Sequence, residues 1–141
     1  MVHALKEIWR VLVPDGILID MRPVVENRDV EVVTGEQVVR AGYFDTSPIS
    51  SIFIDADDAI SQVVRECWFV QERKIVFDFF WYWDTVEDVQ EYIEDNWAED
   101  IIVPGGLWDE VQRLLADGGS EARVRYHDRI MIQRLARKDS R

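Results

Sequence analysis

The spacing between apolar residues differs from one segment of this chain to the next, and the spacing typical of helices is the clearest. Apolar residues recur every three or four positions in four segments, namely 4–12, 60–67, 86–97 and 107–115. Asp84-Thr85-Val86-Glu87 precedes the third segment as a capping-box sequence, in which we expect Asp84 to cap the helix and Glu87 to reach back. The pattern therefore predicts three to four helices.

Other segments have the period or the composition of β-strands. Gly16–Met21 is a nearly continuous apolar run, which is typical of a strand covered on both faces. Residues 30–33 and 37–40 flank a glycine turn and form either a hairpin or one kinked strand, and residues 50–54 are expected to add a short strand before a helix capped near Asp57. The final strand, kinked at Asp128, alternates charged residues with Val124, Tyr126, Ile130 and Ile132.

The segment Phe69–Trp83 has the alternation of a long strand, and its second half is aromatic on both faces. Sorting by parity places Asp78, Phe80 and Tyr82 on one face, and Phe79, Trp81 and Trp83 on the other. This is more apolar surface than an exposed sheet edge usually carries, so we expect something to cover it. The aromatic stretch is core, a subunit interface or the wall of a ligand cleft.

These elements predict an α+β fold, with a mixed, mostly antiparallel sheet and three to four helices, in a single domain over residues 1–141. The formal charge of -12 excludes nucleic acid as a main partner, because Lys and Arg neutralise phosphates. No apolar run approaches the roughly 20 residues of a membrane helix. With one cysteine and no signal-peptide pattern, we expect a protein of the reducing cytoplasm.

Few residues have the spacing of a catalytic or metal site. Cys67 lies on an apolar helical stripe, which favours a buried structural thiol over a nucleophile. His3 and His127 have no ligand partners nearby in sequence, so they are expected to be lone solvated histidines, and no metal site is predicted. A calcium loop beginning at Asp55 is disfavoured because Ile60 stands where the loop needs glycine.

The run from Ala4 to Pro23 resembles a segment of the class I S-adenosylmethionine-dependent methyltransferases, L-x-E-x-x-R-V-L-K-P-G-G-x-L. In that family the segment forms the helix before the fifth strand, the turn and the fifth strand itself. Val13 and Asp15 depart from the pattern, where the family has Lys and its first Gly. The residues that match are Glu7, Arg10, Val11, Leu12, Pro14 and Gly16.

The resemblance implies that this chain is equivalent to the C-terminal half of such an enzyme. The family's cofactor site is a glycine-rich turn after the first strand and an acidic residue after the second, and the chain is expected to begin after both. Neither Gly105-Gly106 nor Gly118-Gly119 has the required setting. We therefore expect no cofactor in this chain alone, and S-adenosylmethionine only if the enzyme is completed by another part.

Two functions of different class follow. The first is a non-catalytic, methyltransferase-derived module that self-associates as a homodimer or binds a partner, because its sheet lacks a neighbour and a cover. The second is the substrate-side part of a methyltransferase, completed by a cofactor-binding partner chain or a missing N-terminal region. The residues expected at a substrate or partner surface are Asp20, Arg22, Phe80, Tyr82, Trp83 and Asp84.

Overall fold

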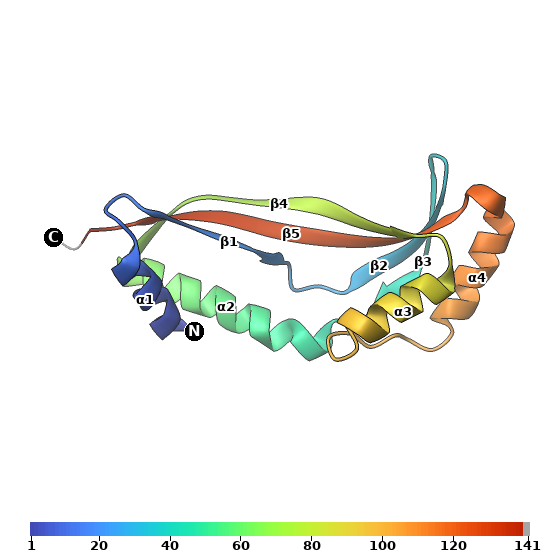
Figure 1. Cartoon of the computed structure of the whole chain (residues 1–141), viewed down its shortest axis with the longest axis horizontal. Helices are drawn as coiled ribbons and strands as arrows, with labels where there is room; N and C mark the ends of the chain where they lie inside the picture. The colour runs from blue at the N-terminus through green and yellow to red at the C-terminus, as the bar shows by residue number, and fades with distance from the viewer. Residues whose placement is uncertain (140–141) are drawn as a thin grey trace. The chain divides into compact units, whose positions relative to one another are not determined.

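A computed structural model describes residues 1–139 and shows an α+β fold, as predicted. Within these residues, four α-helices accompany an open, mostly antiparallel five-stranded sheet (Figure 1). The elements are α1 (Val2–Val11), β1 (Ile17–Pro23), β2 (Arg28–Thr34), β3 (Gln37–Phe44), α2 (Ser47–Arg65), β4 (Phe69–Trp83), α3 (Val86–Asn96), α4 (Leu107–Gly118) and β5 (Arg123–Arg137).

The strand β5 organises the sheet. One edge of β5 pairs antiparallel with β1, from Ile17 opposite Ala136 to Pro23 opposite Ile130, and then with β2, where Asp29 faces His127. β3 pairs with β2 as the hairpin that the sequence left open, and β4 pairs with β5 on its other edge. No further strand of residues 1–139 pairs with the outer edge of β4.

The chain divides into two compact units, each made of segments that are distant in sequence. Among the described residues, unit 1 comprises 1–24, 51–77 and 129–139, and unit 2 comprises 25–50 and 78–128. In unit 1, the helices α1 and α2 pack on β1, β4 and β5. The core of this unit contains Leu5, Ala59, Ile60, Val63, Phe69 and Leu135.

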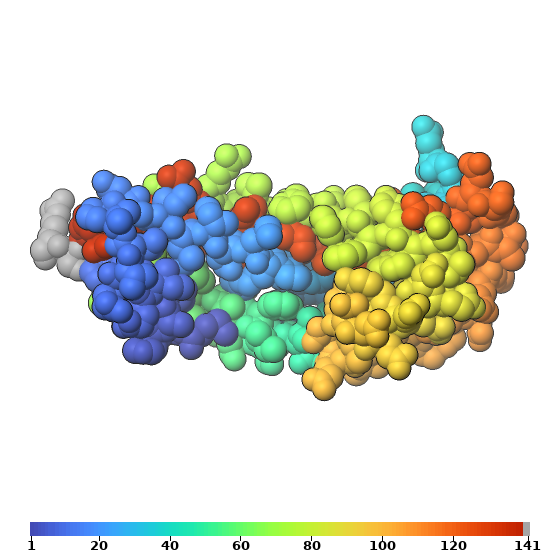
Figure 2. Space-filling model, in the orientation of Figure 1, coloured from blue at the N-terminus to red at the C-terminus, as the bar shows by residue number. Residues whose placement is uncertain are grey.

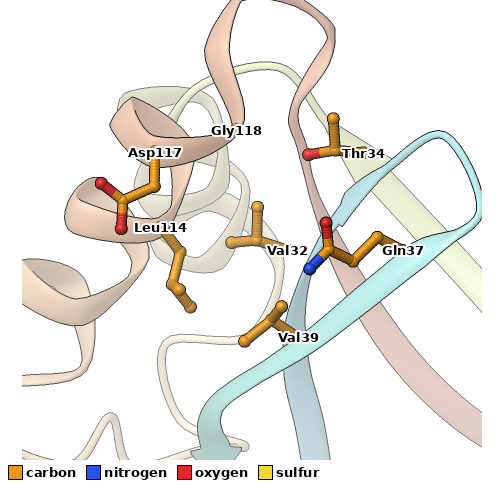
Figure 3. Close-up of a pocket in the computed structure, with 7 residues that line it drawn as sticks. All are labelled: Val32, Thr34, Gln37, Val39, Leu114, Asp117 and Gly118. Carbon is orange, nitrogen blue, oxygen red and sulfur yellow. The ribbon is translucent and has the colours of Figure 1, made fainter.

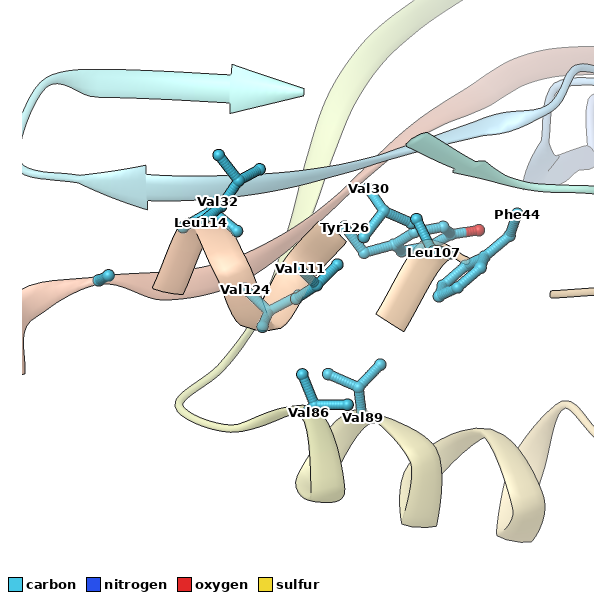
Figure 4. Close-up of a cluster of buried hydrophobic side chains, with 11 residues drawn as sticks. Val30, Val32, Phe44, Val86, Val89, Leu107, Val111, Leu114, Val124 and Tyr126 are labelled. Atoms are coloured by element: carbon cyan, nitrogen blue, oxygen red, sulfur yellow. The ribbon is translucent and has the colours of Figure 1, made fainter. Parts of the chain in front are cut away.

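Unit 2 packs α3 and α4 on its part of the sheet (Figure 4). Val124 and Tyr126 of β5 point into this core, as the alternation predicted. Trp81 and Trp83 of β4 pack against it, together with Tyr92 and Trp97. The residues buried at the centre of this core include Val30, Val32, Phe44, Val86, Val89, Leu107 and Val111.

The buried face of β5 changes parity near Asp128. Even-numbered residues up to Asp128 are buried, whereas Met131, Gln133 and Leu135 are the buried residues of the second half. Ile130 and Ile132, which alternate with charged residues in the sequence, therefore do not continue the buried stripe of Val124 and Tyr126. The strand changes phase at the position where a kink was expected, and the alternation of apolar residues on both faces concealed the change.

Three local predictions need correction. Residues 50–54 are not a strand, because α2 already begins at Ser47. Thr85, not Asp84, caps α3, and its hydroxyl accepts a hydrogen bond from the Asp88 amide at 3.1 Å. Cys67 is exposed and adopts φ 63° in the turn after α2, so it is not a buried thiol. A left-handed residue after a helix points out of the apolar stripe.

The strand β1 is also less covered than its apolar run predicted. Its alternate residues Ile17, Ile19 and Met21 are 43%, 49% and 62% exposed, while Leu18 packs against the core of unit 1. One face is therefore open. No helix within residues 1–139 is both long and apolar enough to cross a bilayer.

Candidate functional site

The strand β4 exposes most of its length. Of its fifteen residues only Phe69 is buried, and the yellow-green side chains of the strand reach the surface in Figure 2. Aliphatic and aromatic side chains account for much of this exposure, which ranges from 39% for Phe77 to 45% for Val70. The large exposed hydrophobic residues of the strand are Val70, Ile75, Val76, Phe77, Phe79 and Tyr82.

The charged residues of β4 differ in whether the chain supplies a partner. Glu72 binds Arg134 at 2.7 Å, and Asp78 accepts from His127 at 2.8 Å. Arg73 and Lys74 form no ion pair within residues 1–139. The strand therefore carries two exposed cations, next to its apolar centre, that have no ion-pair partner in the described part of the chain.

A groove of about 230 Å³ lies in unit 1 beside this part of β4. Ile19 and Ile132 continue its apolar wall from the neighbouring strands. No buried nucleophile and no paired acid and base lies among its lining residues. The lining residues are Ile19, Arg73, Ile75, Ile132, Gln133 and Arg134.

The sheet face of unit 2 opposite its helices carries ion pairs interleaved with aromatic rings. Arg125 donates to Glu31 at 2.6 Å and lies over the ring of Phe80 at 4.4 Å. Burial lowers the pKa of Arg125, but hydrogen bonds with Glu31 and Tyr82 outweigh it and raise the pKa above its ordinary value. His127 stacks near Phe80, with ring centroids 4.7 Å apart.

One group on this face has the residue types of a metal site. Ligand atoms of Asp29, Glu31 and His127 lie within 4.8 Å of one another. Both carboxylates, however, already bind arginines, Asp29 with Arg40 at 2.7 Å and Glu31 with Arg125 at 2.6 Å. These pairs neutralise the charge that would attract a divalent cation, so the group is accounted for as a salt-bridge network. His127 is nevertheless not the lone solvated histidine that the sequence predicted.

Asp20 and Arg22, which the sequence placed at a substrate or partner surface, connect β1 to α2. Arg22 donates to Asp20 at 3.0 Å, to Asp57 at 2.8 Å and to the carbonyl of Phe53 at 3.0 Å. Burial opposes the charge of Arg22, but the hydrogen bonds with Asp20 and Asp57 outweigh this and raise its pKa. Gln133 also donates to Asp20, at 2.7 Å. Both side chains are therefore occupied by contacts within unit 1.

The remaining predicted surface residues separate into two groups. Phe80, Tyr82 and Asp84 lie on the open face of unit 2, where Arg123 binds Asp84 at 2.7 Å and lies over Tyr82 at 5.4 Å. Trp83 instead packs against the core of the unit. Within this set, the structure joins Asp20 to Arg22, and Tyr82 to Asp84 through Arg123.

A second cavity, of about 210 Å³, lies in unit 2 between α4 and the β2–β3 hairpin (Figure 3). Val32, Val39 and Leu114 form its apolar wall, and Asp117 is its one charged residue. Because Asp117 binds Arg113 at 3.0 Å, the cavity offers no free charge to orient a ligand.

Comparison with known proteins gives no relative: no family model, no curated protein and no solved structure matches the chain.

The sequence did not indicate that the middle of β4 is exposed. Lys74 and Val76 drew no attention because nothing in their type suggests chemistry. Their exposure depends on β4 being an edge strand, and an alternating apolar pattern occurs in edge and central strands alike. The one available signal was the aromatic stretch, which begins one residue beyond Val76.

Proposed function

We propose that the chain is a non-catalytic self-associating module, derived from the C-terminal half of a class I S-adenosylmethionine-dependent methyltransferase, and that it forms a homodimer through the free edge of β4. The module needs no cofactor of its own for this role. As a protein with a single, exposed cysteine, it belongs in the reducing cytoplasm.

One observation carries the proposal: a fifteen-residue strand at the edge of the sheet buries only Phe69. An exposed, long, apolar edge presents a row of unpaired backbone groups, and it pairs readily with another strand. Natural proteins that stay monomeric protect such edges with proline, bulges, very short strands or charged side chains, Lys in particular. Of these protections β4 has charged side chains, namely Glu72, Arg73, Lys74 and Asp78. β4 contains no proline and no glycine.

The other free edges have more protection. β1 has seven residues and ends in Pro23, which lacks a backbone donor. β3 has eight residues and contains Arg40 and Gly42, at the level where its register with β2 shifts. β4 is longer than either and has no comparable interruption, so it is the edge that we assign to the partner.

A second copy is a better occupant than a cofactor-binding chain for a specific reason. A completed methyltransferase would use Asp20 and Arg22 at its ligand site, but both side chains are held by Asp57, Phe53 and Gln133. Releasing them would leave partly buried charges unpaired. The free edge of β4 requires no rearrangement before it pairs.

Light scattering after size-exclusion chromatography tests the proposal, at chain concentrations of about 1 to 100 µM, where interfaces of modest size dissociate. We expect a dimer that dissociates on dilution. Val76→Lys, at the middle of β4, should give a folded monomer, since the residue is 41% exposed. Its melting temperature should equal that of the wild-type chain at a dilution where the wild type is also monomeric. Val13→Lys is the matched control on a site that is 70% exposed, and should leave the dimer intact.

A wild-type chain that remains monomeric at the highest concentration would refute the proposal. Calorimetric titration with S-adenosylmethionine addresses the alternative: heat of binding from the isolated chain would show a cofactor site and contradict a non-catalytic module.

A further inference from the structure

If β4 pairs with β4 of a second copy, the two strands must pair in a definite register. We propose that two chains pair their β4 strands antiparallel about a two-fold axis, with Val76 of each chain opposite Val76 of the second copy. This inference rests on the proposed dimer and specifies its geometry.

Two-fold symmetry restricts the registers in which the two β4 strands can pair. A two-fold axis normal to the sheet keeps every side chain on its own face, and residues directly opposite each other in an antiparallel pair share a face. One residue must therefore face its own copy on the axis. Val76 is the middle residue of β4, with seven residues on either side. Only this choice pairs the strand over its whole length.

The same register matches the exposed apolar residues with one another. Ile75 comes opposite Phe77 of the second copy, and Val70 comes opposite Tyr82 of the second copy. These four side chains are between 39% and 45% exposed in the single chain. Cross-strand pairs of aromatic and β-branched residues stabilise a sheet by roughly 0.2–1 kcal/mol each. Each pair occurs twice in the dimer, and the pair at Val76 occurs once.

The charges of β4 are complementary in this register as well. Lys74, which has no ion pair within residues 1–139, comes opposite Asp78 of the second copy. The side chain of Asp78 is 58% exposed, so a cation of the second copy can reach it beside its contacts within the chain. Arg73 comes opposite Phe79 of the second copy, where a guanidinium over an exposed ring is favourable.

The two neighbouring registers are worse. Placing Ile75 on the axis sets Glu72 opposite Asp78 of the second copy, and like charges directly opposite destabilise a pair. Placing Phe77 on the axis sets Val76 opposite Asp78 and leaves Lys74 opposite an aromatic residue. Charge and apolar matching therefore select the same register as strand length.

Cysteine cross-linking tests the register, in a Cys67→Ser background that removes the exposed native thiol. Oxidation of Val76→Cys with copper phenanthroline should give a covalent dimer, because opposite Cβ atoms lie about 4.5–5.5 Å apart. Val70→Cys is the matched control with similar exposure. In the proposed register, residue 70 of one chain lies twelve residue steps, about 40 Å, from residue 70 of the second copy. These two cysteines should therefore not cross-link. An equimolar mixture of Val70→Cys and Tyr82→Cys chains should cross-link as a heterodimer.

A charge reversal adds a measurement in solution. Lys74→Glu should weaken dimerisation about tenfold, since it replaces two attractive cross-strand pairs with two repulsive ones. Arg65→Glu makes the same charge change at an exposed site on α2 and should leave the dissociation constant unchanged.

The outcomes separate the two proposals. If light scattering shows a dimer but neither Val76→Cys nor the mixed pair cross-links, the register is wrong and self-association stands. If the chain is a monomer by light scattering, both fail. Cross-linking of Val70→Cys to itself would also overturn the register.

Discussion

Arg28 on β2 and Asp128 on β5 form a buried ion pair in unit 2, with Nε 2.6 Å from Oδ1 and side chains only 2% and 10% exposed. The pair lies where the buried face of β5 changes parity. Neighbouring Tyr126 is affected as well: burial, reinforced by the charge of Asp128, raises the pKa of its phenol far above the ordinary value. A buried charged pair thus lies at the irregular point of β5.

Asp128→Ala should therefore lower the free energy of unfolding by roughly 3–5 kcal/mol, because it leaves the buried guanidinium of Arg28 without its counter-charge. Urea denaturation followed by tryptophan fluorescence measures the change. Asp84→Ala breaks an ion pair whose side chains are 76% and 48% exposed, and should cost no more than about 1 kcal/mol. Equal losses for the two variants would show that the burial of the Arg28 pair does not matter.

Arg22→Met should destabilise the chain by about 2–3 kcal/mol, since Asp20 is only 19% exposed and loses its cation. Adding Asp20→Asn should recover part of the loss by removing the stranded charge. Arg10→Met, which breaks the exposed pair with Glu7, should cost less than about 1 kcal/mol. Because Arg22 lies away from β4, the dimer dissociation constant should not change; a large change would return Arg22 to the partner surface.

Glu66 predicts a dependence of stability on pH. Hydrogen bonds from Lys6, Gln62 and Trp68 lower the pKa of its carboxyl from 4.5 to about 2. A carboxyl whose pKa is lower in the folded chain adds stability that is complete above about pH 4.5 and is lost as the pH falls towards 2. Urea midpoints between pH 2 and 5 should thus fall less steeply for Glu66→Gln than for the wild type. Lys6→Met should also flatten this profile, and two profiles as steep as the wild type would contradict the assignment.

Thr85→Ala should lower the free energy of unfolding by about 1 kcal/mol, because the Asp88 amide loses its acceptor at the start of α3. Thr85→Ser keeps the hydroxyl and should retain most of the stability. Asp84→Ala is the comparison variant, because the sequence predicted Asp84 as the cap of this helix. If it costs more than Thr85→Ala, the cap lies at Asp84 after all.

The sequence correctly predicted the elements in which the apolar residues keep one regular spacing over many residues. The helix at 86–97 was found with its apolar stripe, since Val86 and Val89 are buried and Ile93 packs against the core. β4 was found over its full length because its alternation is long. Residues 50–54 were misread as a strand because Ile52, Phe53 and Ile54 favour strands, although the residues belong to a nineteen-residue helix.

The positions that failed depend on contacts between distant segments. The pairing of Arg28 with Asp128 joins residues a hundred positions apart, and no local pattern indicates which charges meet across a sheet. The contact between Arg22 and Asp57 likewise depends on where α2 lies against β1. Parity arguments fail at a change of phase such as the one near Asp128, because a one-residue shift exchanges the two faces of a strand.

The discontinuous composition of the two units has a practical consequence for protein engineering. β4 passes from unit 1 to unit 2 after Phe77, and β5 passes back after Asp128. A single truncation therefore cannot deliver either unit intact, since any one cut leaves strands of both in the same fragment. Isolating one unit would require new loops that rejoin its separate segments in a rearranged chain. Choosing new termini alone would not achieve this.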